Sequence, residues 1–143
     1  MGEWVRSTQD VQIGDPEAGP VQEETIRNEA WQVSASFFLT RDTAAYKTVA
    51  PKKNFEPSAG TAGGVEIVAR YGRLNVDPDA FPVYADPAKS ARRAADKAVG
   101  ANWYLNRNVK VMLDYIRTSF EGGAKSGDRP DEKVLLSRFQ IAF

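Results

Sequence analysis

Hydrophobic side chains recur at every second position through most of the chain. Near its end, Leu135, Phe139, Ile141 and Phe143 occupy odd positions, and Leu136, Arg138, Gln140 and Ala142 occupy the even positions between them. Successive side chains of a β-strand point to opposite faces, so this alternation predicts a strand with one apolar face. The same period of two predicts strands over residues 3–13, 30–40, 64–74, 96–105, 108–120 and 133–143.

The connections between these strands predict an antiparallel arrangement. Asn106, Arg107 and Asn108 form a tight turn, because asparagine tolerates left-handed backbone and makes local hydrogen bonds. Residues 121–131 read as a glycine-rich polar loop, and residues 40–63 and 75–95 as long connections. Within the second of these, residues 87–98 are compatible with a short helix capped by Asp86. Nothing reads as a crossover helix, so we expect an all-β antiparallel meander of about six long strands.

Composition removes most catalytic possibilities. The 143 residues contain 19 basic and 19 acidic side chains, and neither cysteine nor histidine occurs. Disulfides, thiolate metal sites, the usual general base and the commonest zinc ligand are therefore excluded. The sequence predicts no enzyme, no cofactor and no metal site. Without a run of like charges, it also predicts no nucleic-acid partner.

Two short motifs are interpreted as structural. The sequence GTAGG at residues 60–64 lacks the Lys-Ser or Lys-Thr ending of a phosphate-binding loop. The densest basic cluster comprises Lys89, Arg92, Arg93 and Lys97, and its simplest interpretation is a solvated loop.

The two faces of the predicted strands differ in character. One face is apolar, whereas the other mixes Gln, Ser, Asn, Gly, Arg, Glu and Asp with some apolar side chains, which is compatible with a wet lumen. Aromatic residues lie towards strand ends on the apolar face, as in the aromatic girdles of membrane barrels. These candidates for the lipid face are Trp31, Tyr71, Trp103, Tyr115 and Phe143. The alternative is the aromatic-rich core of a soluble sheet protein.

Three sequence blocks carry a family resemblance. They are GVEIVARYGRLNV at residues 64–76, NWYLNRNVKVMLDYIRT at 102–118 and SRFQIAF at 137–143. Together they resemble the C-terminal part of the phosphate-selective porin O and P family, with its WELxxRYS-like strand, GxNWYxNxNVRxxxNY hairpin and final RxQxxF. The upstream WQVSASFFLT at residues 31–40, followed by Tyr46, fits the same order of motifs.

The resemblance implies a C-terminal segment of a 16-stranded transmembrane β-barrel in the bacterial outer membrane. Six strands are too few to close a membrane barrel, so we expect residues 1–143 to be a partial barrel, as a fragment or a truncated product. The implied function is passive diffusion of small anions, of phosphate or polyphosphate type. The implied partners are outer-membrane lipid, the assembly machinery that recognises the C-terminal strand, and two further copies in a homotrimer.

The sequence departs from the family pattern at several positions. Val65 stands where tryptophan is usual, Gly72 where serine is common and Asp114 where asparagine is usual. The carboxylate at Asp114 adds a negative charge that opposes anion selectivity. Arg117 falls in the outward phase near a strand end, so we expect its guanidinium to reach the lipid head groups.

Three basic residues fall on the predicted lumen face. They are Arg70, Lys110 and Arg138, and basic side chains in a pore favour anions. A structural role is the stronger interpretation, for instance an ion pair of Arg70 with Glu66 or of Lys110 with Asp114.

A soluble all-β ligand-binding module, lipocalin-like, is the alternative function, and it would need closed edges and a buried core. If Phe143 lies at the periplasmic rim, residues 75–95 and 121–131 are extracellular. Residues 41–63 and 106–108 are then periplasmic. Long loops outside and short turns inside are usual in membrane barrels, and the 41–63 connection is the exception.

Overall fold

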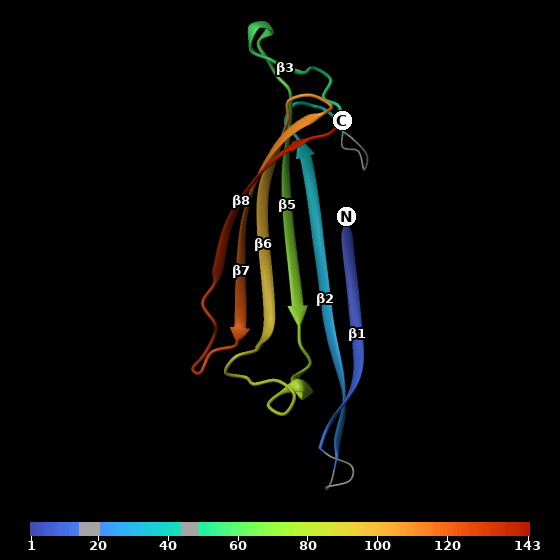
Figure 1. The fold of residues 1–143 in the computed structure, drawn as a ribbon, viewed down its shortest axis with the longest axis vertical. Coiled ribbons are helices and arrows are strands. Elements are labelled where there is room, and N and C mark those ends of the chain that lie inside the picture. Colours follow the sequence, from blue (N-terminus) through green and yellow to red (C-terminus); the bar gives the residue numbers. More distant parts are fainter. Residues whose placement is uncertain (15–20, 44–48) are drawn as a thin grey trace.

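The computed structural model describes residues 1–14, 21–43 and 49–143, and one antiparallel sheet of six strands dominates it (Figure 1). The strands are β1 (Gly2–Ile13), β2 (Gln22–Phe38), β5 (Gly64–Asn75), β6 (Ala91–Tyr104), β7 (Val109–Gly122) and β8 (Glu132–Ile141). They lie in the sheet in chain order, and each neighbouring pair is antiparallel. The predicted meander of about six long strands is confirmed.

Smaller elements occupy the connections. A two-stranded hairpin, β3 (Phe55–Glu56) with β4 (Thr61–Ala62), encloses the 3-10 turn η1 (Pro57–Ala59). A second 3-10 turn, η2 (Pro78–Ala80), lies between β5 and β6. Across the described ranges, no helix is long and apolar enough to cross a membrane.

β2 begins well before the predicted residue 30. Its first residues pair with β1 as far as Ile13 with Gln22, whereas pairing with β5 starts only at Glu29. The first part of β2 therefore extends past the sheet as a hairpin with β1. Residues 22–29 are mostly polar on both faces, so they carry no alternation that the sequence could reveal.

The helix expected over residues 87–98 does not form, because β6 begins at Ala91. Asp86 does cap a single turn, since its carboxylate accepts from the Ala88 backbone N at 2.9 Å and its carbonyl from the Ser90 N at 2.8 Å. Beyond that turn the chain pairs with β5 on one side and β7 on the other. Two ladders of interstrand hydrogen bonds outweigh the helix propensity of an alanine-rich segment, which amounts to tenths of a kcal/mol per residue.

The connections fall at two ends of the sheet (Figure 1). One end holds residues 39–43 and 49–63, the C-terminus and the turn before β7. In that turn Asn106 Oδ1 accepts from the backbone N of Asn108 at 2.8 Å and of Val109 at 2.9 Å. The other end holds the 76–90 connection and the loop after Gly122. The predicted tight turn is confirmed, while Tyr46 lies outside the described residues.

The 76–90 connection packs on the projecting hairpin. Asp77 accepts from the Arg27 backbone N through Oδ2 at 2.7 Å, and its own N donates to Asn28 Oδ1 at 3.1 Å. Farther along, the Tyr84 hydroxyl donates to the Gln22 carbonyl at 3.1 Å. The pKa of Asp77 lies below its ordinary value because the backbone N–H groups of Arg27 and Asp79 donate to the carboxylate.

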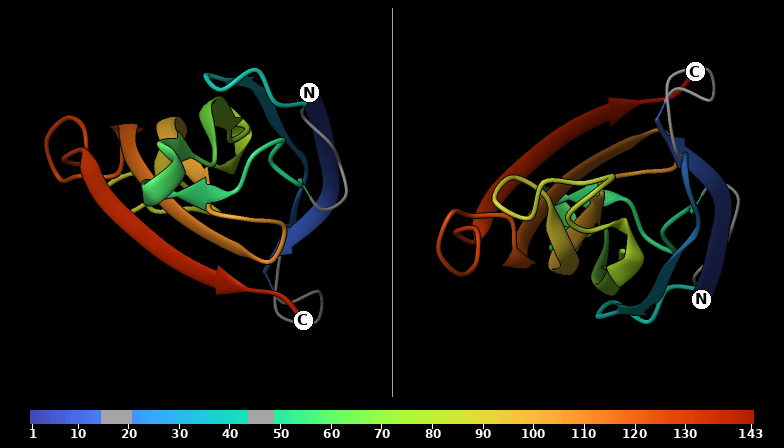
Figure 2. Two further views of the ribbon diagram at one scale, coloured as in Figure 1. Left: turned by 90° about the horizontal axis from the view of Figure 1, so that it is seen from above. Right: turned by 90° about the horizontal axis from the view of Figure 1, so that it is seen from below.

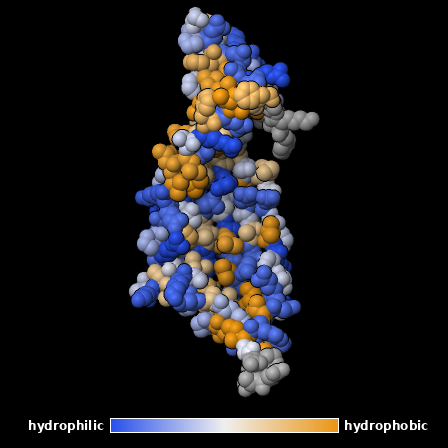
Figure 3. Space-filling view, in the orientation of Figure 1, coloured by the Kyte–Doolittle hydropathy of each residue, from blue (hydrophilic) through white to orange (hydrophobic). Residues whose placement is uncertain are grey.

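The sheet is strongly curved when seen along its strands (Figure 2). Its only cluster of buried apolar side chains among the described residues consists of Phe38, Val49 and Tyr104, at the end of the sheet where β2 and β6 end. The face presented in Figure 3 mixes hydrophilic and hydrophobic residues along its length. The described part of the chain therefore has a small core and two extensive surfaces.

Candidate functional site

A hollow of about 740 Å³ lies on one face of the sheet. Side chains from β2, β5, β6, β7 and β8 line it, together with Val49. Cross-strand partners share a face, so the even-numbered residues of these five strands lie on the face that contains the hollow and the odd-numbered residues form the outer face. One such row across the hollow is Ser36, Val68, Gly100, Asp114 and Leu136.

Glu66 is the most enclosed acidic residue of the hollow, with 7% of its surface exposed. The Asn102 Nδ2 group and the Tyr104 hydroxyl each donate to its Oε2 at 2.9 Å. The Lys110 Nζ lies over the Tyr104 ring, 5.6 Å from its centroid. These contacts hold a carboxylate in a fixed position at the end of the hollow nearest Val49.

Two further carboxylates lie flat against the wall because glycine faces each of them. Asp114 pairs with Gly100, and a Cβ on that glycine would overlap Asp114 Oδ1 and lie 2.9 Å from the Leu113 carbonyl oxygen. Asp96 pairs with Gly72 in the same way, and a Cβ there would overlap Asp96 Oδ1. Because glycine has no side chain, the carboxylates of Asp114 and Asp96 can lie over the backbone of the neighbouring strand.

The predicted lumen residues lie on the face of the hollow but do not form one cluster. Arg70 lines the hollow and pairs with Asp96, with Nε at 3.2 Å and a terminal nitrogen at 3.1 Å from Oδ2. Lys110 contacts Tyr104. Arg138, on β8, is exposed and pairs across the sheet with Met112 on β7.

The ion-pair partners expected from the sequence are therefore not the ones observed. Residues four apart along a strand lie about 13 Å apart, too far for an ion pair. Arg70 pairs with Asp96 on the neighbouring strand instead of Glu66, and Lys110 contacts Tyr104 instead of Asp114.

No pattern in the sequence marks Asp96, Asn102 or Tyr104 as site residues. Their importance depends on which residue faces them across the sheet, and that register is set by the connections. The one local signal was the spacing of Gly72 and Gly100, since glycine inside a strand marks a close approach by another group.

The outer face exposes large apolar side chains in successive rows. Exposure reaches 68% at Phe37, 67% at Leu135 and 63% at Phe139. On β7 the outward positions from Val109 to Tyr115 are all apolar. This surface contrasts with the polar hollow on the other side of the same strands.

Aromatic residues lie at both ends of this apolar surface. Trp31 and Tyr71 contact each other at one end, with ring centroids 5.3 Å apart. At the other end Trp103 packs against Phe55, 5.0 Å between centroids, and donates to the Ala62 carbonyl at 2.6 Å. The remaining two candidates differ, because Tyr115 lies within the apolar rows and Phe143 follows the end of β8.

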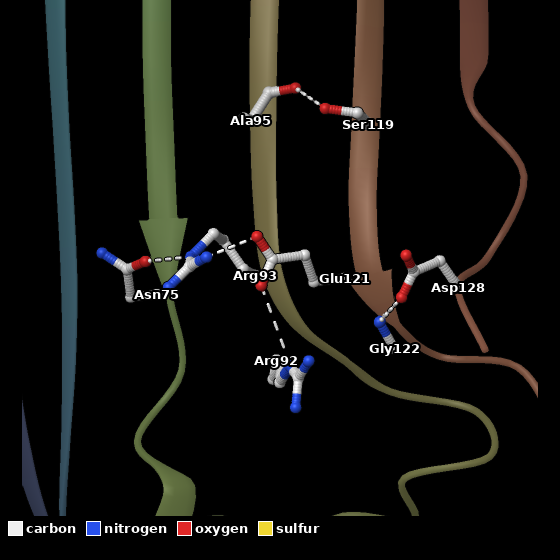
Figure 4. A network of polar contacts seen from close by, with 8 residues as sticks. All are labelled: Asn75, Arg92, Arg93, Ala95, Ser119, Glu121, Gly122 and Asp128. Atoms are coloured by element: carbon white, nitrogen blue, oxygen red, sulfur yellow. Dashed lines mark hydrogen bonds and ion pairs between the residues drawn. The ribbon is translucent and has the colours of Figure 1, made fainter.

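The basic cluster interpreted as a solvated loop belongs mostly to β6, which contains Arg92, Arg93 and Lys97. Figure 4 shows Arg93 held between β5 and β7, where its Nε donates to Asn75 Oδ1 at 2.9 Å and a terminal nitrogen pairs with Glu121. Arg92 pairs with the same carboxylate at 3.8 Å. The solvated-loop interpretation is thus wrong for these two arginines, whose ion pairs join β6 to β7, while the hydrogen bond of Arg93 adds β5.

Comparison with known proteins gives two findings. The model of the family described as phosphate-selective porin O and P matches residues 3–143. Among curated proteins, Porin O of Pseudomonas aeruginosa is 25% identical over 122 residues, which cover 82% of this chain and 27% of that protein. The chain therefore spans about a quarter of the length of the relative that it matches.

Proposed function

Because the chain belongs to the phosphate-selective porin O and P family, we propose that residues 1–143 form the C-terminal strands of a 16-stranded transmembrane β-barrel. This barrel resides in the bacterial outer membrane and lets small anions, of phosphate or polyphosphate type, diffuse passively through a water-filled lumen.

The observation that carries this proposal is the opposite character of the two faces. A membrane barrel needs an apolar outer surface and a polar interior on alternate residues of every strand. The exposed rows of Phe37, Leu135 and Phe139 meet the first requirement. The hollow with Glu66 and Arg70 meets the second.

The two sheet edges support a larger closed barrel. β1 and β8 stand at the borders of the described sheet and pair on one side only. Unpaired strand edges do not persist in hydrocarbon, where every backbone polar group needs a partner. Further strands would therefore pair with β1 and β8. The edge of β8, which ends near Phe143, is the surface that the outer-membrane assembly machinery would recognise.

The lumen would act by supplying water and fixed charge along the path of the ion. We assign Arg70, Lys110 and Arg138 as lumen-facing cations that attract anions and can donate hydrogen bonds to phosphate oxygens. Glu66, Asp96 and Asp114 carry the opposite charge on the same wall. A net preference for anions would therefore require basic residues on the other strands, where we also expect the constriction. A homotrimer is part of the same proposal.

The orientation follows from the same family pattern. We place the end with the 76–90 and 123–131 loops outside the cell and the end with Asn106 and Phe143 in the periplasm. The outer-face aromatic residues would then lie at the two membrane interfaces, with Trp31 and Tyr71 at the outer interface and Trp103 at the periplasmic one. The 39–63 connection remains the long periplasmic exception.

A soluble lipocalin-like module is not favoured. Such a protein would bury its apolar face in a core, whereas Phe37 and Phe139 are mostly exposed. It would also close its sheet, whereas β1 and β8 are not neighbours in the described sheet.

The test is a chimera in which this chain replaces the matching quarter of Pseudomonas aeruginosa Porin O. Incorporated into planar bilayers, the chimera should open channels whose reversal potential in a KCl gradient shows anion preference. Replacing Arg70, Lys110 and Arg138 by glutamine should shift the reversal potential towards cations. A chimera that reaches the membrane folded but forms no channel would refute the proposed function.

A further inference from the structure

Three cations lie side by side on the outer face, across β6, β7 and β8. The register pairs Lys97 with Arg117 and Arg117 with Lys133. All three residues are exposed, and we call them the basic row. Directly opposed side chains on adjacent strands have Cβ atoms about 5 Å apart, so like charges there repel each other.

Only part of this charge is balanced within the protein. Asp131 accepts from Arg117 Nε at 2.8 Å and from a terminal nitrogen of the same guanidinium at 2.6 Å. Among the described residues, neither Lys97 nor Lys133 forms an ion pair. The three cations of the basic row and the carboxylate of Asp131 therefore sum to a charge of +2.

The basic row marks one border of the apolar surface. The row directly next to it consists of Val99, Tyr115 and Leu135, which are 52%, 42% and 67% exposed. From Val109 to Arg117 β7 runs nine residues, and a tilted strand crosses the hydrocarbon core in about nine to eleven. If the sheet spans a membrane, the basic row lies where the acyl chains end and the phosphate groups begin.

The two borders of the apolar surface differ in charge. At the opposite end, the outer-face row of Val65, Trp103, Val111 and Phe139 carries no charged side chain. Of these two outer-face rows, only the one at the end that we place outside the cell carries positive charge.

We infer that the basic row is a binding site for the phosphate groups of a lipid in the outer leaflet, with the acyl chains of that lipid on the adjacent apolar rows. Charge complementarity selects the phosphate, because lysine and arginine form charge-assisted hydrogen bonds with its oxygens. The neighbouring apolar rows select an amphiphile over free phosphate. This site rests on the proposed placement in the outer membrane, but it lies outside the lumen and is independent of ion conduction.

The experiment uses the Porin O chimera that carries this chain in a closed barrel, placed in nanodiscs of phosphatidylcholine. The three probes are diphosphoryl lipid A, the same lipid without its phosphates, and inorganic phosphate. Bound lipid is counted by native mass spectrometry. We expect the unmodified chimera to retain diphosphoryl lipid A in preference to the dephosphorylated lipid. Millimolar inorganic phosphate should not displace it.

Three variants isolate the basic row. Lys97→Gln, Arg117→Gln and Lys133→Gln together should weaken retention of diphosphoryl lipid A at least tenfold, since each surface cation contributes about a factor of five. The matched control removes three cations from the opposite face through Arg70→Gln, Lys110→Gln and Arg138→Gln. That control should bind the lipid as the unmodified chimera does. A swap that keeps the charge, Lys97→Arg with Arg117→Lys and Lys133→Arg, should retain it as well.

Equal retention by the outer-face variant and the unmodified chimera would overturn the inference, as would an equal loss in the inner-face control. Displacement by inorganic phosphate would also overturn it, because the row would then bind free phosphate. Failure of the unmodified chimera to enter neutral discs would instead refute the membrane placement and the lipid site with it. Normal lipid binding beside a chimera without channels would refute only the proposed function.

Discussion

Gly100 and Asp114 face each other across β6 and β7, and the position of the carboxylate depends on the missing side chain. The same holds for Gly72 and Asp96 on β5 and β6. At the residue scale, the sequence predicted which side chains lie on the polar face, but it did not predict which of them are cross-strand neighbours. Side chains such as Arg70 find their partners across the sheet, and the distances are fixed by a register that no local pattern encodes.

We predict that Gly100→Ala destabilises the sheet by about 1–3 kcal/mol, because the new methyl group meets the Leu113 carbonyl oxygen as well as Asp114. Gly72→Ala should cost less, since only the movable Asp96 side chain stands in its way. Urea titration of both variants in detergent, followed by tryptophan fluorescence, would measure the difference. Equal stability of the two variants would contradict the assigned contacts.

A second prediction concerns charge in the hollow. Asp114→Asn removes a carboxylate from the proposed lumen and should raise the ratio of anion to cation permeability in the porin chimera. Asp131→Asn is the matched control, because that carboxylate pairs with Arg117 on the outer face. Reversal potentials in a KCl gradient would compare them. An identical shift from both variants would remove Asp114 from the ion path.

At the scale of elements, alternation predicted six strands, and all six are present. It located their apolar stretches well and their polar ends poorly. β2 begins in a polar segment that only pairing with β1 defines, and β6 begins where alanines suggested a helix. The β3–β4 hairpin within the 39–63 connection was missed because its strands have two residues each, too few to show a period.

The 76–90 connection offers a pH test. The depressed pKa of Asp77 means that its hydrogen bonds stabilise the docked connection above the ordinary aspartate pKa of about 3.9. This contribution is lost as the pH falls through the lower pKa of the folded state. Spin labels on cysteines introduced at Thr8 and Val83 should show a broader distance distribution once the pH falls below the lowered pKa of Asp77. With Asp77→Asn the distribution should not change with pH in this range.

The orientation of the strands is tested by labelling. In the chimera on intact cells, a cysteine replacing Ser126 should react with a membrane-impermeant thiol reagent, and one replacing Arg107 should not. Both residues are exposed and the chain has no cysteine of its own. The reverse labelling pattern would invert the proposed topology.

At the scale of the whole molecule, the sheet is not a self-contained globule. A folded monomer of 15.8 kDa exposes about 7,300 Å², whereas this chain exposes 10242 Å². The excess reflects two uncovered faces and two unpaired edges. The sequence suggested this state only through its family resemblance, because alternation alone does not reveal what an apolar face contacts.

We therefore predict that the isolated chain aggregates in plain buffer and disperses in detergent, because detergent covers the apolar face. Analytical ultracentrifugation with and without dodecyl maltoside would show this. A monodisperse species with a cooperative thermal transition in buffer would support the soluble module instead.

The alternation of faces also governs which insertions and deletions the gene can accept. Losing one residue between Ala94 and Tyr104 would exchange the two faces of β6 over part of its length, placing Asp96 or Asn102 against lipid and Val99 or Trp103 in the hollow. The one irregularity of this pairing, between Ala91 and Arg93, lies at the strand end, where few side chains are affected. Residues 123–131 face no such constraint, so length variation among relatives should concentrate there and foreign peptides could be displayed from that loop.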